Sequence, residues 1–436
     1  MSQPDSSYLE LIDIILSNPR EQEINILNAN QELINQKLIS CLMSVGEKLR
    51  IAGNIAAAER LSDLASKLLQ LQTTNISVEQ RREYFRFLMT LLQQVANQNE
   101  PHSIYALITK NQDKLDKNLT NILKYWATET ILSVDSQEQR AIANDLVNFA
   151  NLISEFSAGD KVNNLELAIV SYYAALKAYN PTVFPLDWAT IQANLGNVLR
   201  DRLLGNRSQN IEEAIVTYQL ALEIITQQKY PELWANTQRN LGIAYTSRLD
   251  GDRSRNLEMA IALYQTALSV HTLDDFPQDW AAGHNNLGDV YLNRIVGEQA
   301  ANLETAIDHL EQALQVYTVQ GFPNSWAMVQ NNLGNAFQSR INGDKTNNIE
   351  RAISSYQNAL SIHTLEKFPY NWAMLNNNLA GTYRYRLKGD KNENKRMAIA
   401  LLKKALIVYT KDKFPRQWAD LQHNIQGISD HRLYTD

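Results

Sequence analysis

The sequence predicts an all-α protein: a right-handed α-solenoid of stacked antiparallel helix pairs, joined to a helical N-terminal region. Three observations support this fold class. Tryptophan recurs every 46 residues over the second two-thirds of the chain. Proline and glycine recur in the same register, at positions typical of helix starts and ends. Between them, apolar residues follow the three-to-four spacing of a helix face.

The N-terminal region, residues 1–139, follows no 46-residue register but is helical in pattern. Gly53–Asn54 is a predicted turn, and 72–77 is the best candidate for a hinge. The region is a cap, a separate interaction module or a continuation of the superhelix, and the sequence leaves these alternatives open. Its apolar spacing predicts helices at Leu33–Ile51, Ile55–Leu71, Val78–Ala96, Ser103–Lys114 and Leu119–Val134.

The solenoid, residues 140–436, is defined by two columns of equivalent residues. The tryptophan column is Trp188, Trp234, Trp280, Trp326, Trp372 and Trp418. The proline column, three residues earlier, is Pro185, Pro231, Pro277, Pro323, Pro369 and Pro415. A degenerate copy with Ile142 in the tryptophan position comes first. The predicted repeats are 140–183, 184–229, 230–275, 276–321, 322–367 and 368–413, followed by a terminal helix at 414–436.

Each repeat is predicted to contain two helices. Proline is favoured in a first helical turn, so the Pro-x-x-Trp-Ala segment begins helix A. A glycine column (Gly205, Gly251, Gly297, Gly343, Gly389) ends helix A, because glycine readily adopts the left-handed conformation that follows a helix. An asparagine column (Asn210, Asn256, Asn302, Asn348, Asn394) then provides the predicted N-caps of helix B.

Helical spacing also predicts which side chains of helix A are buried. At 100° per residue, Trp and the residues 1, 7, 8, 11 and 15 positions after it share one stripe, so Trp is expected to pack in the core. The arginine column, 14 positions after Trp, lies on the flank of that stripe. Its head groups are expected to reach the glutamates of helix B, namely Glu212, Glu258, Glu304 and Glu350.

These motifs resemble tetratricopeptide repeats. Leu-Gly-x-x-Tyr in helix A and Ala-x-x-x-Tyr-x-x-Ala in helix B (Ala214, Tyr218, Ala221) match that family in residue type and spacing. The usual unit has 34 residues, so each repeat here is longer. The long form is similar to repeats of photosynthetic bacteria that accompany caspase-like (CHAT) domains. The resemblance implies a protein-interaction solenoid whose concave groove is lined by helix A.

A second asparagine column, six residues after each Trp, is predicted to face away from the packing stripe. An amide both donates and accepts hydrogen bonds, so a ladder of amides can pair with the backbone of an extended peptide. The alternatives are that Asn bridges adjacent helices A or persists from duplication. The predicted peptide-binding residues are Asn194, Asn240, Asn286, Asn332 and Asn378, with Asn197, Asn293, Asn335, Asp289, Arg239 and Tyr385 on the same face.

Composition and motifs exclude several function classes. The net charge of -6 and the mixed charge distribution argue against nucleic acid as a partner. No segment has the length of a membrane span, and the single cysteine and the lack of a secretion signal favour the cytoplasm. No nucleophile elbow is present, and His271 and His363 are expected to pack rather than bind metal. We therefore expect no enzyme, no cofactor and no metal.

The sequence favours a scaffold that holds a protein or an extended peptide in the helix A groove. One alternative is a regulatory subunit of a separately encoded peptidase or signalling NTPase. A helical-repeat RNA binder is the third, and the charge disfavours it.

Overall fold

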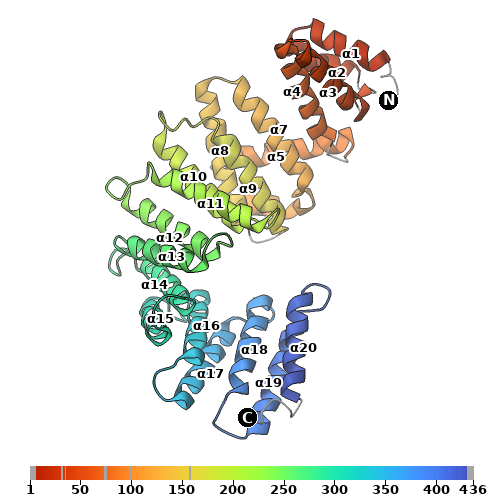
Figure 1. The fold of residues 1–436 in the computed structure, drawn as a ribbon. Helices are drawn as coiled ribbons and strands as arrows, with labels where there is room; N and C mark the ends of the chain where they lie inside the picture. Colours follow the sequence, from red (N-terminus) through yellow and green to blue (C-terminus); the bar gives the residue numbers. More distant parts are fainter. Residues whose placement is uncertain are drawn as a thin grey trace. The chain divides into compact units, whose positions relative to one another are not determined.

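The computed structural model describes residues 6–30, 33–34, 36–72, 76–98, 100–156 and 159–429, and the regular secondary structure in these ranges is helical (Figure 1). Successive helices pack in adjacent pairs. The chain divides into two compact units. Unit 1 contains residues 1–183 and 202–204, and unit 2 contains residues 184–201 and 205–436.

Unit 1 begins with four helices that share one core. The sequence pattern did not predict the first two of these helices. Leu11, Ile15, Leu38 and Leu61 are fully buried among them, and Gly53 adopts the predicted turn with φ +84°. The helices are α1 (Ser6–Ser17), α2 (Glu23–Ala29), α3 (Gln36–Ile51) and α4 (Ile55–Gln72).

The remaining helices of unit 1 confirm the predicted elements to within a few residues. Helix α7 packs against both α5 and α9, and α8 pairs with α9. The degenerate repeat supplies α8 and α9, and Gly159 between them has φ +81°. The helices are α5 (Val78–Ala96), α6 (Pro101–Lys110), α7 (Lys117–Ser133), α8 (Ser136–Glu155) and α9 (Lys161–Ala175).

Unit 2 contains the Trp-containing repeats. Helices A are α10 (Pro185–Asp201), α12 (Pro231–Ser247), α14 (Pro277–Leu292), α16 (Pro323–Ser339), α18 (Pro369–Arg384) and α20 (Pro415–Ser429). Helices B are α11 (Arg207–Leu222), α13 (Arg253–Leu268), α15 (Gln299–Ala313), α17 (Lys345–Ile362) and α19 (Lys391–Ala405). Each helix A begins at its proline, as predicted. Residues 430–436 of the predicted terminal helix lie outside the described residues.

The predicted caps of helix B were wrong. Helix B begins four residues earlier than predicted, and the residue before it is the cap. The side chains of Asn206, Asp252, Asp344 and Asp390 accept main-chain N–H bonds of the first turn. The predicted caps (Asn210, Asn256, Asn302, Asn348, Asn394) are instead buried. Asn256 shows their role, because its Nδ2 donates to the main-chain oxygen of Asp250 at 2.9 Å and ties the A–B turn to the helix.

The glycine column has the predicted left-handed backbone, with φ between +77° and +84°. It does not directly follow helix A, however. Helix α12 ends at Ser247, and Gly251 lies further along, in the A–B turn. Helix A is shorter than predicted because the chain leaves the helix near the arginine column, where Arg248 already has extended backbone with ψ 127°.

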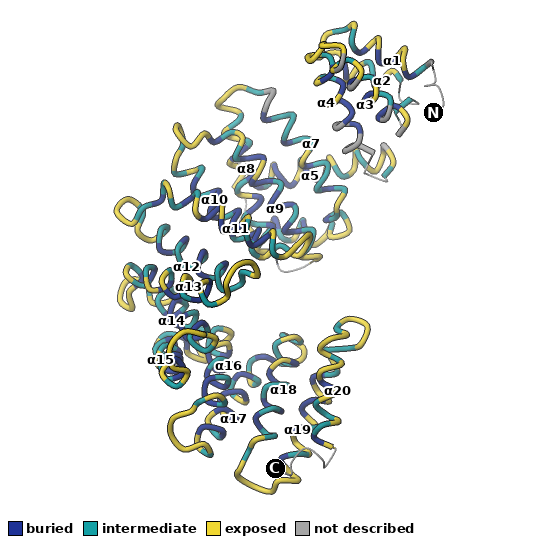
Figure 2. The backbone as a smooth tube through the Cα atoms, in the orientation of Figure 1, coloured by how far each residue is buried: buried dark blue, intermediate teal, exposed yellow. Residues whose placement is uncertain are grey.

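The core of unit 2 lies between the two helix rows, as the dark blue segments of Figure 2 show. One continuous cluster extends from Ala281 to Ile428. Glycine in helix A lets the tyrosine of helix B lie flat against it. A Cβ atom on Gly242 would lie 2.6 Å from Cε1 of Tyr264, so only glycine permits this close packing.

The helices A of unit 2 also contact one another from repeat to repeat. Helix α10 contacts α12, α12 contacts α14, α14 contacts α16, and α16 contacts α18, whereas contacts between successive helices B are weaker. In a stack of helix pairs, the more closely spaced row lies on the inside of the curve. Helices A therefore form the inner row, which is the row that the sequence predicted to line the groove.

Candidate binding groove

A pocket of about 470 Å³ is hollowed into the helix A row between α14 and α20. Its walls come from α14, α16, α18 and α20, and Tyr356 and Leu402 of helices B form part of its floor. Five predicted residues line it: Asp289, Asn293, Asn335, Asn378 and Tyr385. The lining also includes Gln338, Ser339, Asn377, Arg384 and Asn424, so the surface is rich in side-chain amides.

Two substitutions within the repeat pattern explain why the pocket lies here. Gly381 stands where other repeats carry Asn197, Asp289 or Asn335, and a Cβ atom on it would meet only Nε2 of Gln338, at 3.9 Å. In the same repeat Leu402 replaces the tyrosine of helix B, and Ala380 replaces the usual glycine of helix A. Loss of these two larger side chains opens the wall and the floor of the groove.

The predicted asparagine ladder is half-buried, and part of it bridges adjacent helices A. Asn332 Nδ2 donates to Asn285 Oδ1 at 3.2 Å, and Asn378 Nδ2 donates to Asn331 Oδ1 at 3.3 Å. These bonds connect α14 to α16 and α16 to α18. Bridging of this kind is the alternative that the sequence analysis left open. An amide has two N–H groups and two lone pairs, so the Asn378 carbonyl oxygen still has accepting capacity for a ligand.

The rest of the ladder lies outside the pocket. Asn240 and Asn286 are half-buried and make no side-chain hydrogen bond with any described residue. Asn194, in α10, is also half-buried and has a partner of its own. The ladder is therefore not uniform, because the amides of Asn240 and Asn286 form no side-chain hydrogen bond with a described residue, whereas those of Asn332 and Asn378 bridge helices A.

The other predicted residues also lie on the helix A row. Asn197 accepts a hydrogen bond from the Tyr218 hydroxyl at 2.7 Å. Arg239, outside the pocket, forms an ion pair with Asp279 of the next helix A at 3.1 Å. Asn293 is exposed and donates to the main-chain oxygen of Asp289. Tyr385 is 50 % exposed, and the Arg384 guanidinium lies 5.7 Å from its ring centroid.

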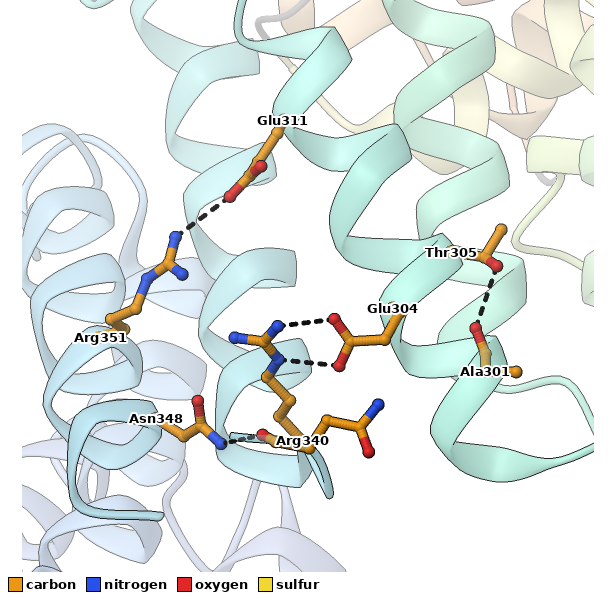
Figure 3. A network of polar contacts seen from close by, with 8 residues as sticks. Ala301, Glu304, Thr305, Glu311, Arg340, Asn348 and Arg351 are labelled. Atoms are coloured by element: carbon orange, nitrogen blue, oxygen red, sulfur yellow. Dashed lines mark hydrogen bonds and ion pairs between the residues drawn. The ribbon is translucent and has the colours of Figure 1, made fainter. Parts of the chain in front are cut away.

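The arginine column confirms its predicted contact with glutamate. Arg340 donates from Nε and a terminal nitrogen to both carboxylate oxygens of Glu304, at 2.8 and 2.6 Å (Figure 3). Equivalent bidentate pairs are Arg248–Glu212, Arg294–Glu258 and Arg386–Glu350, and Arg202–Glu166 lies in unit 1. The hydrogen bonds from arginine lower the pKa of three of these glutamates, Glu258, Glu304 and Glu350. In unit 2 each pair joins helix A to helix B of the preceding repeat.

The tryptophan column is half-buried and packs on the core, as expected, with Trp280, Trp326 and Trp372 against the long cluster. The residue 15 positions after Trp was placed wrongly on the packing stripe. Leu249, Ile295 and Leu387 are more than 60 % exposed, because helix A ends before this position and the A–B turn carries these side chains into solvent.

His271 and His363 pack as predicted, each against the Phe five residues later, with ring centroids 5.7 and 4.9 Å apart. No cluster of three or more potential metal ligands occurs among the described residues. No helix in the described part of the chain is long and apolar enough to span a membrane. The sequence analysis did not assign Gln338, Ser339 or Asn377 to the site, although Asn377 adjoins the asparagine column that it did identify.

No protein-family model and no curated protein matches this chain. Among solved structures, it is similar to the APC/C hetero-tetramer Cut9–Hcn1, with 14% identity, TM-score 0.41, and coverage of 97% of this chain and 83% of that one. It is also similar to a TPR repeats protein of Bacteroides fragilis, with 15% identity, TM-score 0.23, and coverage of 66% and 98%. A circular tandem repeat protein gives 13% identity, TM-score 0.27, and coverage of 97% and 94%. The helical-repeat fold is established by the packing of this chain's own helices.

Proposed function

We propose that this protein is an interaction scaffold that holds an extended peptide in the helix A groove of unit 2. The observation that carries the proposal is the convergence of side-chain amides from successive helices A on one pocket. Amides pair with N–H and C=O groups alike, so they suit the backbone of a peptide that lacks its own secondary structure. The inner row of a helical solenoid supplies the long surface that such a segment needs.

Two amides in the pocket provide a sharp test, because they make no side-chain hydrogen bond with a described residue. Asn377 and Asn424 line the groove, and their replacement breaks none of the interhelical bonds of Asn332 or Asn378. The probe is a phage-displayed library of random 12-residue peptides, panned on the full chain. We expect the double variant Asn377→Ala with Asn424→Ala to weaken binding of the selected peptides at least tenfold, measured by fluorescence anisotropy.

The matched control removes two exposed amides outside the pocket, Asn324→Ala with Asn347→Ala. This control should bind the selected peptides like the parent protein, and both variants should keep the parent's circular dichroism. Failure to select any peptide, or equal binding by all three proteins, would overturn the proposed function.

A further inference from the structure

One side chain in the groove lacks the partner that its equivalents have. In two repeats of unit 2 an asparagine nine residues after Trp accepts a hydrogen bond from the tyrosine hydroxyl of helix B. Asn197 accepts from Tyr218, and Asn335 accepts from Tyr356, both at 2.7 Å. The equivalent residue in repeat 276–321 is Asp289, and it carries a negative charge where the others are neutral.

The tyrosine that would serve Asp289 is absent. The equivalent position in helix B is Leu310, which is fully buried and has no hydroxyl to donate. Among the described residues, no side chain forms a hydrogen bond or an ion pair with the Asp289 carboxylate. The one bond recorded at this residue, from Asn293 Nδ2 at 2.8 Å, goes to its main-chain oxygen.

The surroundings of Asp289 make an unpaired charge costly. The residue is half-buried and lines the pocket. Burial raises the pKa of its carboxyl, and the charge of Arg253 opposes this only in part. Arg253 itself donates to the main-chain oxygen of Thr246. A carboxylate that is partly removed from water is stabilised strongly by a cation that donates hydrogen bonds to it.

We infer that Asp289 selects a lysine or arginine side chain of the bound peptide, and that the amides around it hold the peptide backbone. This inference rests on the proposed function. It fits the rest of the pocket, where the other charged lining residue, Arg384, lies two repeats away against Tyr385. A cationic side chain therefore has one preferred place along the groove, which fixes the register of the peptide.

The test uses the peptides selected on the parent protein. We expect them to share a Lys or Arg, and synthetic versions with that residue changed to Glu to bind at least tenfold more weakly. Asp289→Asn should weaken binding of the original peptides by a similar factor. The control Asp274→Asn removes an exposed carboxylate of the preceding repeat, outside the pocket, and should leave binding unchanged.

A second variant keeps the carboxylate but supplies the missing donor. Leu310→Tyr restores the residue found at Tyr218, Tyr264 and Tyr356, and Gly288 leaves room for the ring as the other glycines do. The new tyrosine hydroxyl should donate a hydrogen bond to the Asp289 carboxylate. The preference of the groove for peptides with Lys or Arg should then fall, although the charge of the protein is unchanged.

The outcomes separate the two proposals. Selected peptides that bind the groove without a shared Lys or Arg, or that bind Asp289→Asn as tightly as the parent, would overturn the role of Asp289 and leave the groove intact. Peptides that are unaffected by loss of Asn377 and Asn424 would overturn the proposed function itself.

Discussion

At the scale of single residues, the packing of unit 2 depends on matched pairs across the helix A–helix B interface. Gly196, Gly242 and Gly334 each lie against a tyrosine ring, with a would-be Cβ 2.5 to 2.7 Å from it. Where helix A carries Ala380, helix B carries the smaller Leu402. In repeat 276–321, by contrast, Gly288 is kept opposite Leu310, so the two positions do not always change in the same repeat.

Gly242→Ala should lower the free energy of unfolding by about 1–3 kcal/mol, because the added methyl overlaps the Tyr264 ring. The matched control is Gly381→Ala. Its new Cβ enters open space in the pocket, and loss of a helical glycine should be neutral or stabilise by about 0.5–1 kcal/mol. Urea denaturation followed by circular dichroism measures both. Equal effects of the two substitutions would contradict this account.

The His284–His309 pair should make unit 2 sensitive to acid. Their Nδ1 atoms lie 2.9 Å apart, and burial, with a contribution from His309, lowers the pKa of His284 to about 4. Burial also lowers the pKa of His309. Unfolded histidine has a pKa of about 6.5, so the unfolded chain takes up protons first, and stability is lost as the pH falls from about 6.5 towards 4.

His284→Gln provides the comparison, because Gln192, Gln238 and Gln330 occupy this position in other repeats. Between about pH 7 and pH 4.5, the parent should lose about 1–2 kcal/mol more stability than the variant, as judged from urea midpoints. The same loss in both proteins would show that the histidine pair does not control acid stability.

The asparagine columns show what sequence can and cannot predict about residues. Period and helical angle placed Asp289, Asn335 and Asn378 on the groove side of helix A, and all three line the pocket. The angle could not show that Asn378 reaches the preceding helix A, because that bond depends on the spacing between repeats. Nor could it show the pocket, which arises from the lack of a side chain at Gly381 and the smaller side chain at Leu402.

At the scale of helices, the sequence predicted which helices of unit 2 exist and in what order. The start of each helix B was harder to predict, because two polar residues could serve as its cap. Proline located the start of every helix A. For helix B two candidates lay close together, and the aspartate or asparagine after the glycine is the cap, as Asp252 shows. Asn256 is buried instead because its amide closes the turn onto Asp250. Which of two nearby polar residues caps the helix depends on the path of the turn in space, and the order of residues in the sequence does not show that path.

The bidentate arginine–glutamate pairs should contribute to the contact between repeats. A double-mutant cycle with Arg340→Ala and Glu304→Ala should give a coupling energy of about 0.5–1 kcal/mol that decreases in about 1 M salt. Arg351–Glu311 is the control pair in Figure 3, since it has one contact at 3.1 Å and both side chains are about half exposed. Its coupling should be near zero, and coupling as large as that of Arg340–Glu304 would argue against the role of bidentate geometry.

At the scale of the whole molecule, the chain has two compact units, and the core of unit 2 passes from repeat to repeat. Most contacts join neighbouring helices, so stability in such an array is a sum of local terms. The sequence pattern divided the chain at residues 139/140, whereas unit 1 extends to Val183 and includes the degenerate repeat. Helices α1 and α2 were not visible to a method based on period.

Destabilisation in one unit should therefore remain local. Leu379→Ala removes a buried side chain of α18 and should speed amide hydrogen exchange in α16–α20, while α5–α9 keep the exchange rates of the parent. Leu146→Ala, in α8, should give the reverse pattern. Mass spectrometry of exchanged peptides measures both, and a uniform increase along the chain would indicate one cooperative unit.

The arginine–glutamate register also bears on how such an array changes over generations. In unit 2 each arginine meets the glutamate 36 residues before it, in the preceding repeat. Any repeat with both residues can therefore follow any other such repeat and find its partner. Duplication or deletion of one such 46-residue block leaves every pair at the new junction matched, whereas repeat 368–413 has Arg396 in the glutamate position. Evolution can thus lengthen or shorten the helix A face in whole steps, while each copy diverges separately, as Asp289 and Gly381 have done.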